Sequence, residues 1–258
     1  MTTDDDKKIS IAVPGEWALK KVLGPTLDTL GEDINKVYQI GRDKIIKVAQ
    51  RKVTNIEDGA SANLRVSRDV FWNGAFTDEA ICAEYFGGIL ASSRSQAGKD
   101  DSGVYYVDLI KSLSSAQLRL HYVIYRTLNK LLVSDQTKKE LNVGQSTELY
   151  AIRLHFASVE LQKAELKIDT DLEALYRKGL LHEYKTDVHK IDDEGKSLPY
   201  TMVVPTTLGV QLFAIANNML ANWREYQIKD FGDFENIPLP KYSALSIDKI
   251  LEDAGLKN

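Results

Sequence analysis

DLEALYRKGLL, residues 171–181, is the stretch that decides the fold of this 258-residue chain. Its apolar residues Leu172, Leu175 and Tyr176 recur at helical spacing. Gly179 follows where a helix end favours a residue in the left-handed conformation. The stretch therefore predicts a short helix that stops at this glycine.

A β-hairpin is predicted directly after this helix. The strand-like segments HEYKTDVHKI and LPYTMVV lie within residues 182–204, and the turn DDEGK between them holds Gly195, which can adopt a positive φ. TTLGVQLFAIANNML then predicts a further helix that starts from a Thr206 or Thr207 cap. A helix, a glycine stop, a hairpin and a capped helix in this order are typical of a winged helix-turn-helix.

The segments before residue 171 supply the remaining parts of a winged helix. Ser114 or Ser115 caps an amphipathic helix, and alternating apolar residues later predict a strand. The polar insertion Ser134–Thr147 lies between these two elements. The predicted parts are a first helix at Ala116–Leu132, a first strand at Glu148–Phe156, a second helix at Ser158–Leu166 and a third helix at Thr170–Gly179.

A leucine stripe marks the N-terminal half. Residues 16–52 read as one long helix or two consecutive ones, and the stripe steps by 4, 3, 4 and 3 residues through Leu23, Leu27, Leu30, Ile34 and Val37. Gly24 and Gly31 share one heptad position, which allows two helix backbones to approach closely. Two interpretations of the stripe remain open: it forms a homodimer interface, or it packs into the core of its own domain.

Shorter helices are predicted after residue 52. One covers Leu64–Trp72, and a second, AICAEYFGGILASS, is capped by Thr77-Asp78-Glu79. Gly87 and Gly88 within the second helix predict a tight helix crossing. The single cysteine, Cys82, excludes an internal disulfide and is expected to be a small buried apolar residue.

The predicted fold class is mainly α with a small β part: an α-helical N-terminal domain and a C-terminal winged helix with a β-hairpin wing. We divide the chain into a flexible tail at 1–15, an α-helical domain at 16–133, a winged-helix domain at 134–225 that borrows its first helix from 115–132, and a C-terminal extension at 226–258.

Composition is that of an ordinary globular protein, with 43% hydrophobic and 27% charged residues. No apolar run approaches the ~18 residues of a membrane-spanning helix. The acidic start MTTDDDKK resembles neither a secretory signal nor a transit peptide, so we expect a cytoplasmic protein. The net charge of −4 argues against a surface built throughout for phosphate backbones, although a local basic face stays possible.

The candidate binding residues are basic. Between Asp171 and Lys190, four basic residues are balanced by four acidic ones, so contact with a protein partner is weighted at least as heavily as nucleic acid. A second basic stretch, Arg42–Lys52, is amphipathic and predicts a solvated helix face or contact with an anionic surface. The candidates for partner or nucleic-acid binding are Arg177, Lys178, Lys185, Lys190, Arg42, Lys44, Lys47 and Arg51.

No motif assembles an active site. The four histidines are scattered, so we expect neither a metal nor a cofactor. Arg177 and His182 match the spacing of the Arg-four-residues-His motif of HEPN ribonucleases, but Gly179 ends the helix between them. The turn-rich loop Ser92–Gly103 is a candidate polar site with Arg94, Asp100 and Asp101, in which the arginine is expected to pair with those carboxylates and fix the loop.

The segment AEYFGGILASSRSQAGKDDSGVYYVDLIKSLSSAQLRLHYVIY, residues 83–125, resembles the abortive-infection alpha (Abi-alpha) family of bacterial proteins of unknown mechanism. LGPTLDTLGEDINKVY, DLEALYRKGLLHEY and TTLGVQLF extend the resemblance over roughly residues 20–220. Ser102 departs from the family pattern, which has a second basic residue there. The resemblance implies defence against phage, with a helical N-terminal module attached to a winged helix.

Three functions follow as hypotheses. The first is an anti-phage, abortive-infection protein that acts by binding a protein partner or nucleic acid rather than by catalysis. The alternative is a winged-helix DNA-binding transcription regulator. The third is a HEPN-like ribonuclease that uses Arg177 and His182.

Overall fold

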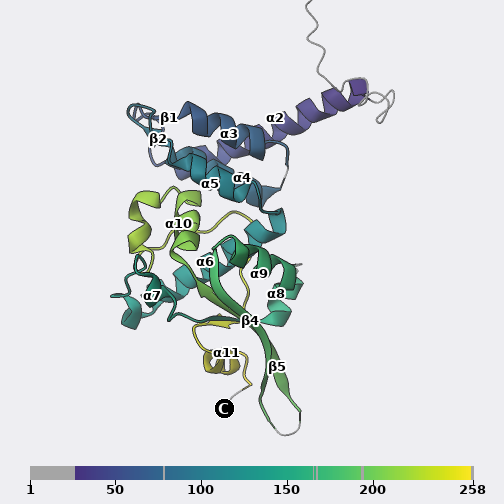
Figure 1. The fold of residues 1–258 in the computed structure, drawn as a ribbon, viewed down its shortest axis with the longest axis vertical. Helices are drawn as coiled ribbons and strands as arrows, with labels where there is room; N and C mark the ends of the chain where they lie inside the picture. Colours follow the sequence, from purple (N-terminus) through teal and green to yellow (C-terminus); the bar gives the residue numbers. More distant parts are fainter. Residues whose placement is uncertain (1–26, 78, 165, 167, 193–194, 257–258) are drawn as a thin grey trace, which may run out of the picture.

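The computed structural model describes residues 27–256 apart from 78, 165, 167, 193 and 194, and only the backbone of residues 27–34 and 136. The chain is mainly helical and carries two small antiparallel sheets. Figure 1 shows an elongated molecule with a helical layer at one end and a projecting hairpin at the other. No helix within the described residues is both long enough and apolar enough to cross a membrane.

Four helices build the N-terminal layer, and a pair of two-residue strands closes its edge. The layer contains α2 (Leu27–Lys52), α3 (Leu64–Gly74), α4 (Ala80–Ser92), α5 (Gly103–Ile110), β1 (Ser61–Ala62) and β2 (Arg94–Ser95). The helices predicted at 64–72 and 80–93 are confirmed within two residues. Strand β2 lies inside the segment predicted to be a loop, and it pairs with β1 in antiparallel orientation.

Helix α4 is buried on every side from Ile81 to Ala91. Its two glycines explain how close its neighbours come: a Cβ on Gly88 would lie 1.8 Å from the Ala216 carbonyl oxygen, and one on Gly87 would lie 2.7 Å from Val48. The predicted tight crossing is therefore confirmed. Cys82 on the same helix is buried, as predicted.

The rest of the chain is built around α6 (Ser115–Ser134). Ser114 caps this helix, and its side chain and that of Gln117 form a reciprocal capping box. The helices that follow are η2 (Gln136–Lys138), α7 (Ser146–Leu149), α8 (Ser158–Lys163), α9 (Ile168–Arg177), α10 (Thr207–Ala216), η3 (Leu220–Glu225) and α11 (Ile247–Asp253). Thr206 caps α10, because its hydroxyl accepts a hydrogen bond from the Gly209 amide.

The larger sheet has the order β4-β5-β3-β6 within the described residues, and every neighbouring pair is antiparallel. Its strands are β3 (Leu154–Ala157), β4 (Leu181–Lys190), β5 (Ser197–Pro205) and β6 (Ser243–Ala244). The predicted hairpin is confirmed as β4 and β5. Gly179 and Gly195 have φ values of +70° and +91°, as the helix stop and the turn require.

Three predicted boundaries are wrong. The second helix, expected at Ser158–Leu166, ends at Lys163. The strand expected at Glu148–Phe156 begins only at Leu154, because the preceding residues form α7 and its C-terminal turn. The helix expected to run from Thr206 to residue 220 ends at Ala216, since the chain turns at Asn218, which has a positive φ of 56°.

One hydrophobic core runs through both halves of the molecule and across the predicted boundary at residue 133. The predicted C-terminal extension supplies part of that core, through Tyr226, Phe231 and Phe234, and also the edge strand β6. The sequence prediction did not foresee either contribution.

Val37, the last residue of the leucine stripe, is the one stripe residue whose side chain the structure describes. Val37 has 42% of its surface exposed, so this residue is not core in the described chain. The predicted tail at 1–15 and Leu23 lie outside the described residues, as do the side chains of Leu27, Leu30 and Ile34.

Candidate functional site

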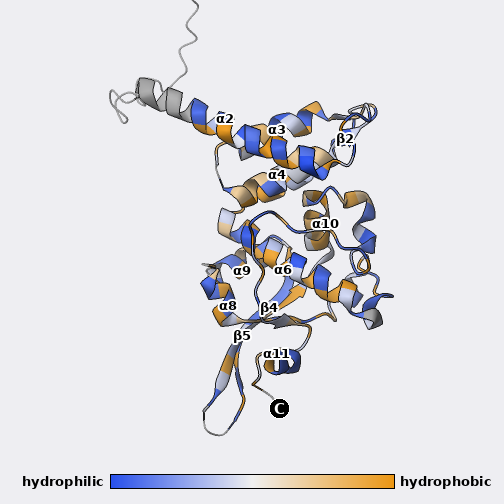
Figure 2. Ribbon diagram, turned by 180° about the vertical axis from the view of Figure 1, so that it is seen from behind, coloured by the Kyte–Doolittle hydropathy of each residue, from blue (hydrophilic) through white to orange (hydrophobic). Residues whose placement is uncertain are grey.

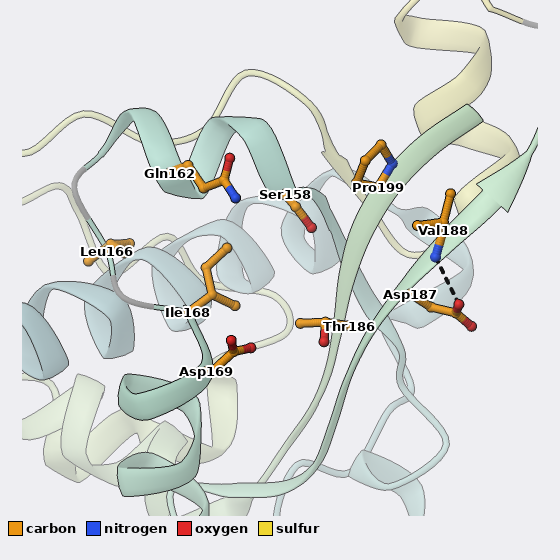
Figure 3. A pocket seen from close by; sticks show the side chains of 9 residues that line it. All are labelled: Ser158, Gln162, Leu166, Ile168, Asp169, Thr186, Asp187, Val188 and Pro199. Atoms are coloured by element: carbon orange, nitrogen blue, oxygen red, sulfur yellow. Dashed lines mark hydrogen bonds between the residues drawn. The ribbon is translucent and has the colours of Figure 1, made fainter. Parts of the chain in front are cut away.

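A groove lies between the two short helices α8 and α9 and the β4–β5 hairpin (Figure 3). Its volume is about 400 Å³, within the range of ligand-binding clefts. Both helices and both strands contribute to it. The groove is lined by Ser158, Gln162, Leu166, Ile168, Asp169, Thr186, Asp187, Val188 and Pro199.

The sheet register positions the groove side chains. Val188 pairs with Pro199 across the hairpin, and Thr186 pairs with Thr201 two residues earlier, so alternate residues of β4 face the helices. On the helix side, the Ser158 hydroxyl lies 3.0 Å from the buried Thr201 hydroxyl. This hydrogen bond joins α8 to β5, so the helix and the hairpin that line the groove are held together.

The groove has one acidic side chain on its helix side, Asp169, whereas the carboxylate of Asp187 points away from the two helices (Figure 3). Asp169 lies in the first turn of α9, and Asp187 lies on β4. Lys185, whose ammonium is 2.5 Å from the Asp187 carboxylate, lowers the pKa of that carboxyl below its usual range. Among the described residues that line the groove, none is basic.

Exposed apolar surface accompanies the Asp169 carboxylate. Val188 is 53% exposed at the groove, and Ile168 and Leu166 form its base. Single exposed apolar residues need no explanation, but here they share one concave surface with the Asp169 carboxylate. The arrangement suits a segment with apolar side chains and a basic group better than it suits a phosphate backbone.

The structure ties half of the basic residues predicted on α9 and β4 to carboxylates of the same elements. Arg177 lies 2.6 Å from Glu173, and Lys185 pairs with Asp187 as described above. Lys178 and Lys190 are exposed, and no ion pair of theirs occurs among the described residues. The exposed side of α9 therefore presents balanced charges rather than a basic surface.

The second predicted basic group, on α2, is divided between two environments. Arg42 pairs with its neighbour Asp43 at 2.8 Å, and Lys44 and Lys47 are exposed. Arg51 instead contacts the body of the protein, where it pairs with Glu84 and with Glu235. Two of these four side chains, Arg42 and Arg51, are therefore paired with carboxylates.

Arg94 fixes a different loop from the one predicted. Its guanidinium donates to Asp58 at 2.6 Å and to the carbonyl oxygens of Ile56 and Ala60, which holds the loop before β1. Asp101 pairs with Arg65 at 3.2 Å, and Asp100 accepts from the amide of Ser102. The predicted pairing of Arg94 with Asp100 and Asp101 is therefore wrong, because its partner lies 36 residues away in the sequence.

Arg177 and His182 have separate partners. The His182 ring stacks on Tyr150, with centroids 3.6 Å apart and planes 9° from parallel, whereas Arg177 binds Glu173. Another histidine, His121, is fully buried, and burial lowers its pKa to about 3. Within the described residues, no three His, Cys, Asp or Glu side chains lie close enough together to hold a metal ion.

The groove itself was not predicted, although its residues carry a weak signal. Val188 is an apolar residue among polar neighbours near the end of a strand, and Leu166 and Ile168 follow a helix of only six residues. Their convergence depends on how α8 and α9 pack on the hairpin. Comparison of the chain with known protein families, with curated proteins and with solved structures finds no match.

Proposed function

We propose that this chain is a cytoplasmic anti-phage protein of the abortive-infection type, which acts by binding a protein partner through a winged-helix module. The resemblance of residues 83–125 to the Abi-alpha family supports the defence role. The acidic, partly apolar groove supports binding and carries the choice of a protein partner. The homodimer predicted from the leucine stripe concerns a different surface, the N-terminal half of α2.

The order of elements supports a winged helix. Helix α6, strand β3, helices α8 and α9 and the hairpin β4–β5 occur in this order in the chain, with η2 and α7 between α6 and β3. Strand β3 pairs with the second strand of the hairpin. In this interpretation α9 takes the position of the recognition helix and the hairpin is the wing. The balanced charge of α9 and the carboxylate of Asp169 in the groove then favour a protein in the place of DNA.

The partner segment is expected to combine apolar side chains with lysine or arginine. Its apolar side chains would cover Val188 and Ile168, and its basic group would approach Asp169. Electrostatic complementarity of this kind contributes mainly to specificity and to the association rate. Binding is therefore expected to weaken when salt concentration rises.

A matched pair of valines tests the role of the groove. Val188 in the groove and Val159 on α8 have exposed fractions of 53% and 48%, and Val159 does not line the groove. In bacteria challenged with a phage panel, Val188→Lys is expected to reduce protection at least about tenfold, the effect of a lost interface anchor. Val159→Lys is expected to protect like the wild type. Circular dichroism of both variants checks that each is folded.

Four results would contradict parts of this proposal. A wild-type chain that protects against no phage in the panel removes the defence role, and equal protection by both valine variants removes the groove. Tight, salt-sensitive binding to one DNA site in a gel-shift series favours the transcription regulator. Loss of protection in His182→Ala, together with ribonuclease activity of the wild type, favours the HEPN-like enzyme.

A further inference from the structure

The first half of α2 projects from the body of the protein. The helix has 26 residues and is therefore about 39 Å long at ~1.5 Å per residue. Its buried positions begin at Gly41 and continue with Ile45 and Val48, while the described side chains from Asn35 to Ile40 are exposed or half-buried. Figure 2 shows this half extending beyond the neighbouring helices.

The direction of the projecting half is fixed by a close helix contact. A Cβ on Gly41 would lie 2.2 Å from the carbonyl oxygen of Ala75, the residue that follows α3. Tyr38, one turn earlier, packs its ring against Phe76 with centroids 5.4 Å apart. These contacts fix the angle at which α2 leaves the body of the protein. They also fix which side of α2 faces the end of α3.

Four large apolar side chains are exposed at this junction, and we call them the α2 patch. They are Val37, Ile40, Trp72 and Phe76, with exposed fractions of 42%, 53%, 71% and 46%. The rings of Trp72 and Phe76 lie 6.2 Å apart, edge to face. A hollow of about 530 Å³ beside Val37, Ile40 and Phe76 gives the surface a concave part.

The charged residues around the hollow have opposite signs. Lys44 on α2 and Glu79 at the start of α4 both line it. A two-fold interface places the same surface on both partners, so that surface must be complementary to itself. One basic and one acidic residue beside the hollow satisfy this condition, because each can face the opposite charge in the other copy. A strongly charged partner would instead favour charges of a single sign around the hollow.

We propose that the α2 patch is the contact surface between two copies of this chain, related by a two-fold axis. Lys44 of each copy then faces Glu79 of the other, and the projecting halves of α2 lie side by side. In the sequence, the residues from Leu23 to Val37 have the heptad spacing expected of a helix pair.

Aromatic residues and a long helix supply the kind of surface from which a dimer interface of standard size is built. Stable interfaces bury about 800 Å² per partner, and one aromatic side chain can contribute ~150–250 Å² of this. Trp72 and Phe76 supply the aromatic anchors, and the projecting half of α2 supplies length. The interface is independent of the groove beside the hairpin, so two copies would present two grooves.

Light scattering of the full-length chain between about 1 and 100 μM tests the proposal. The wild type is expected to have twice the 29.0 kDa mass of one chain. Ile40→Asp places a carboxylate in the patch and is expected to raise the dimer dissociation constant at least about 100-fold. Leu64→Asp is the control, because Leu64 is 85% exposed at the first position of α3 and outside the patch. It is expected to remain a dimer.

A wild type that is monomeric at ~100 μM overturns the proposal, because interfaces of standard size associate at micromolar concentration or below. An Ile40→Asp variant that stays dimeric shows that the copies meet elsewhere and also overturns it. Trp72→Ala is a second test of the patch, in case the Ile40→Asp variant misfolds. With circular dichroism unchanged, it is expected to weaken the dimer at least about tenfold, and an unchanged dissociation constant contradicts the proposed anchor.

Discussion

At the scale of single residues, the ion pair between Lys52 and Glu84 is the strongest constraint on the N-terminal layer. Both side chains are nearly inaccessible, with 8% and 3% exposed, and the ammonium lies 2.5 Å from the carboxylate. Burial lowers the pKa of Lys52 from 10.5 to about 8, against the opposing effect of Glu84. Between these values the unfolded chain binds more protons than the folded one, so the contribution of Lys52 to stability rises with pH.

The loss of stability caused by Glu84→Gln is therefore expected to depend on pH. At pH 7 it leaves a buried ammonium without its carboxylate and is expected to lower the free energy of unfolding by about 3–5 kcal/mol. At pH 9.5 Lys52 is mostly neutral in the folded state, and the loss is expected to shrink. Urea unfolding at both pH values measures this loss, with Glu57→Gln, at an exposed glutamate outside the α2 patch, as control. Equal losses at both pH values would contradict the assigned pKa.

Local conformational rules predicted the residues whose roles are local. Gly179 and Ser114 act within their own turn or cap, and both were predicted from their neighbours in sequence. The partners of Arg94 and Glu84 lie 36 and 32 positions away, and many carboxylates and lysines were available to each. Only the folded structure determines which of these residues becomes the partner. The groove residue Val188 was missed for the same reason.

At the scale of elements, the crossing of α4 and α10 makes a specific prediction about Gly88. Ala usually stabilises a helix by ~1 kcal/mol relative to Gly. Here the added Cβ would lie 1.8 Å from the Ala216 carbonyl oxygen, so two backbones must separate. Gly88→Ala is expected to destabilise the protein by about 3 kcal/mol or more in urea unfolding. A variant that gains stability would show that the two helices can move apart freely.

Elements with a repeated pattern were predicted best. The hairpin and helix α9 have clear periodicity and a glycine at each turn, and the structure confirms them. The first strand was placed six residues too early, because apolar alternation from 148 to 153 also fits the short helix α7 and its turn. The edge strand β6 has two residues, which is too few for any period to be read.

At the scale of the whole molecule, long-range packing joins segments that the sequence suggests are separate. Arg126 on α6 is only 2% exposed and pairs with Asp230 at 2.5 Å and Asp233 at 2.7 Å, so residues after 225 neutralise a buried charge of the central helix. Tyr226 and Phe234 enter the same core. No local pattern in residues 226–258 indicates this dependence, because each contact requires the complete fold.

Two truncations of the chain test how far this dependence extends. A chain that ends at Glu225 loses the two carboxylates of Arg126 and three core aromatics, and it is expected not to fold, since an unpaired buried charge alone costs about 3–5 kcal/mol. A chain that ends at Leu245 loses α11, whose Ile250 and Leu251 belong to a separate small cluster, and it is expected to fold with reduced stability. Circular dichroism and urea unfolding compare both with the full chain. A cooperative unfolding transition in the shorter chain would show that the core is complete without residues 226–258.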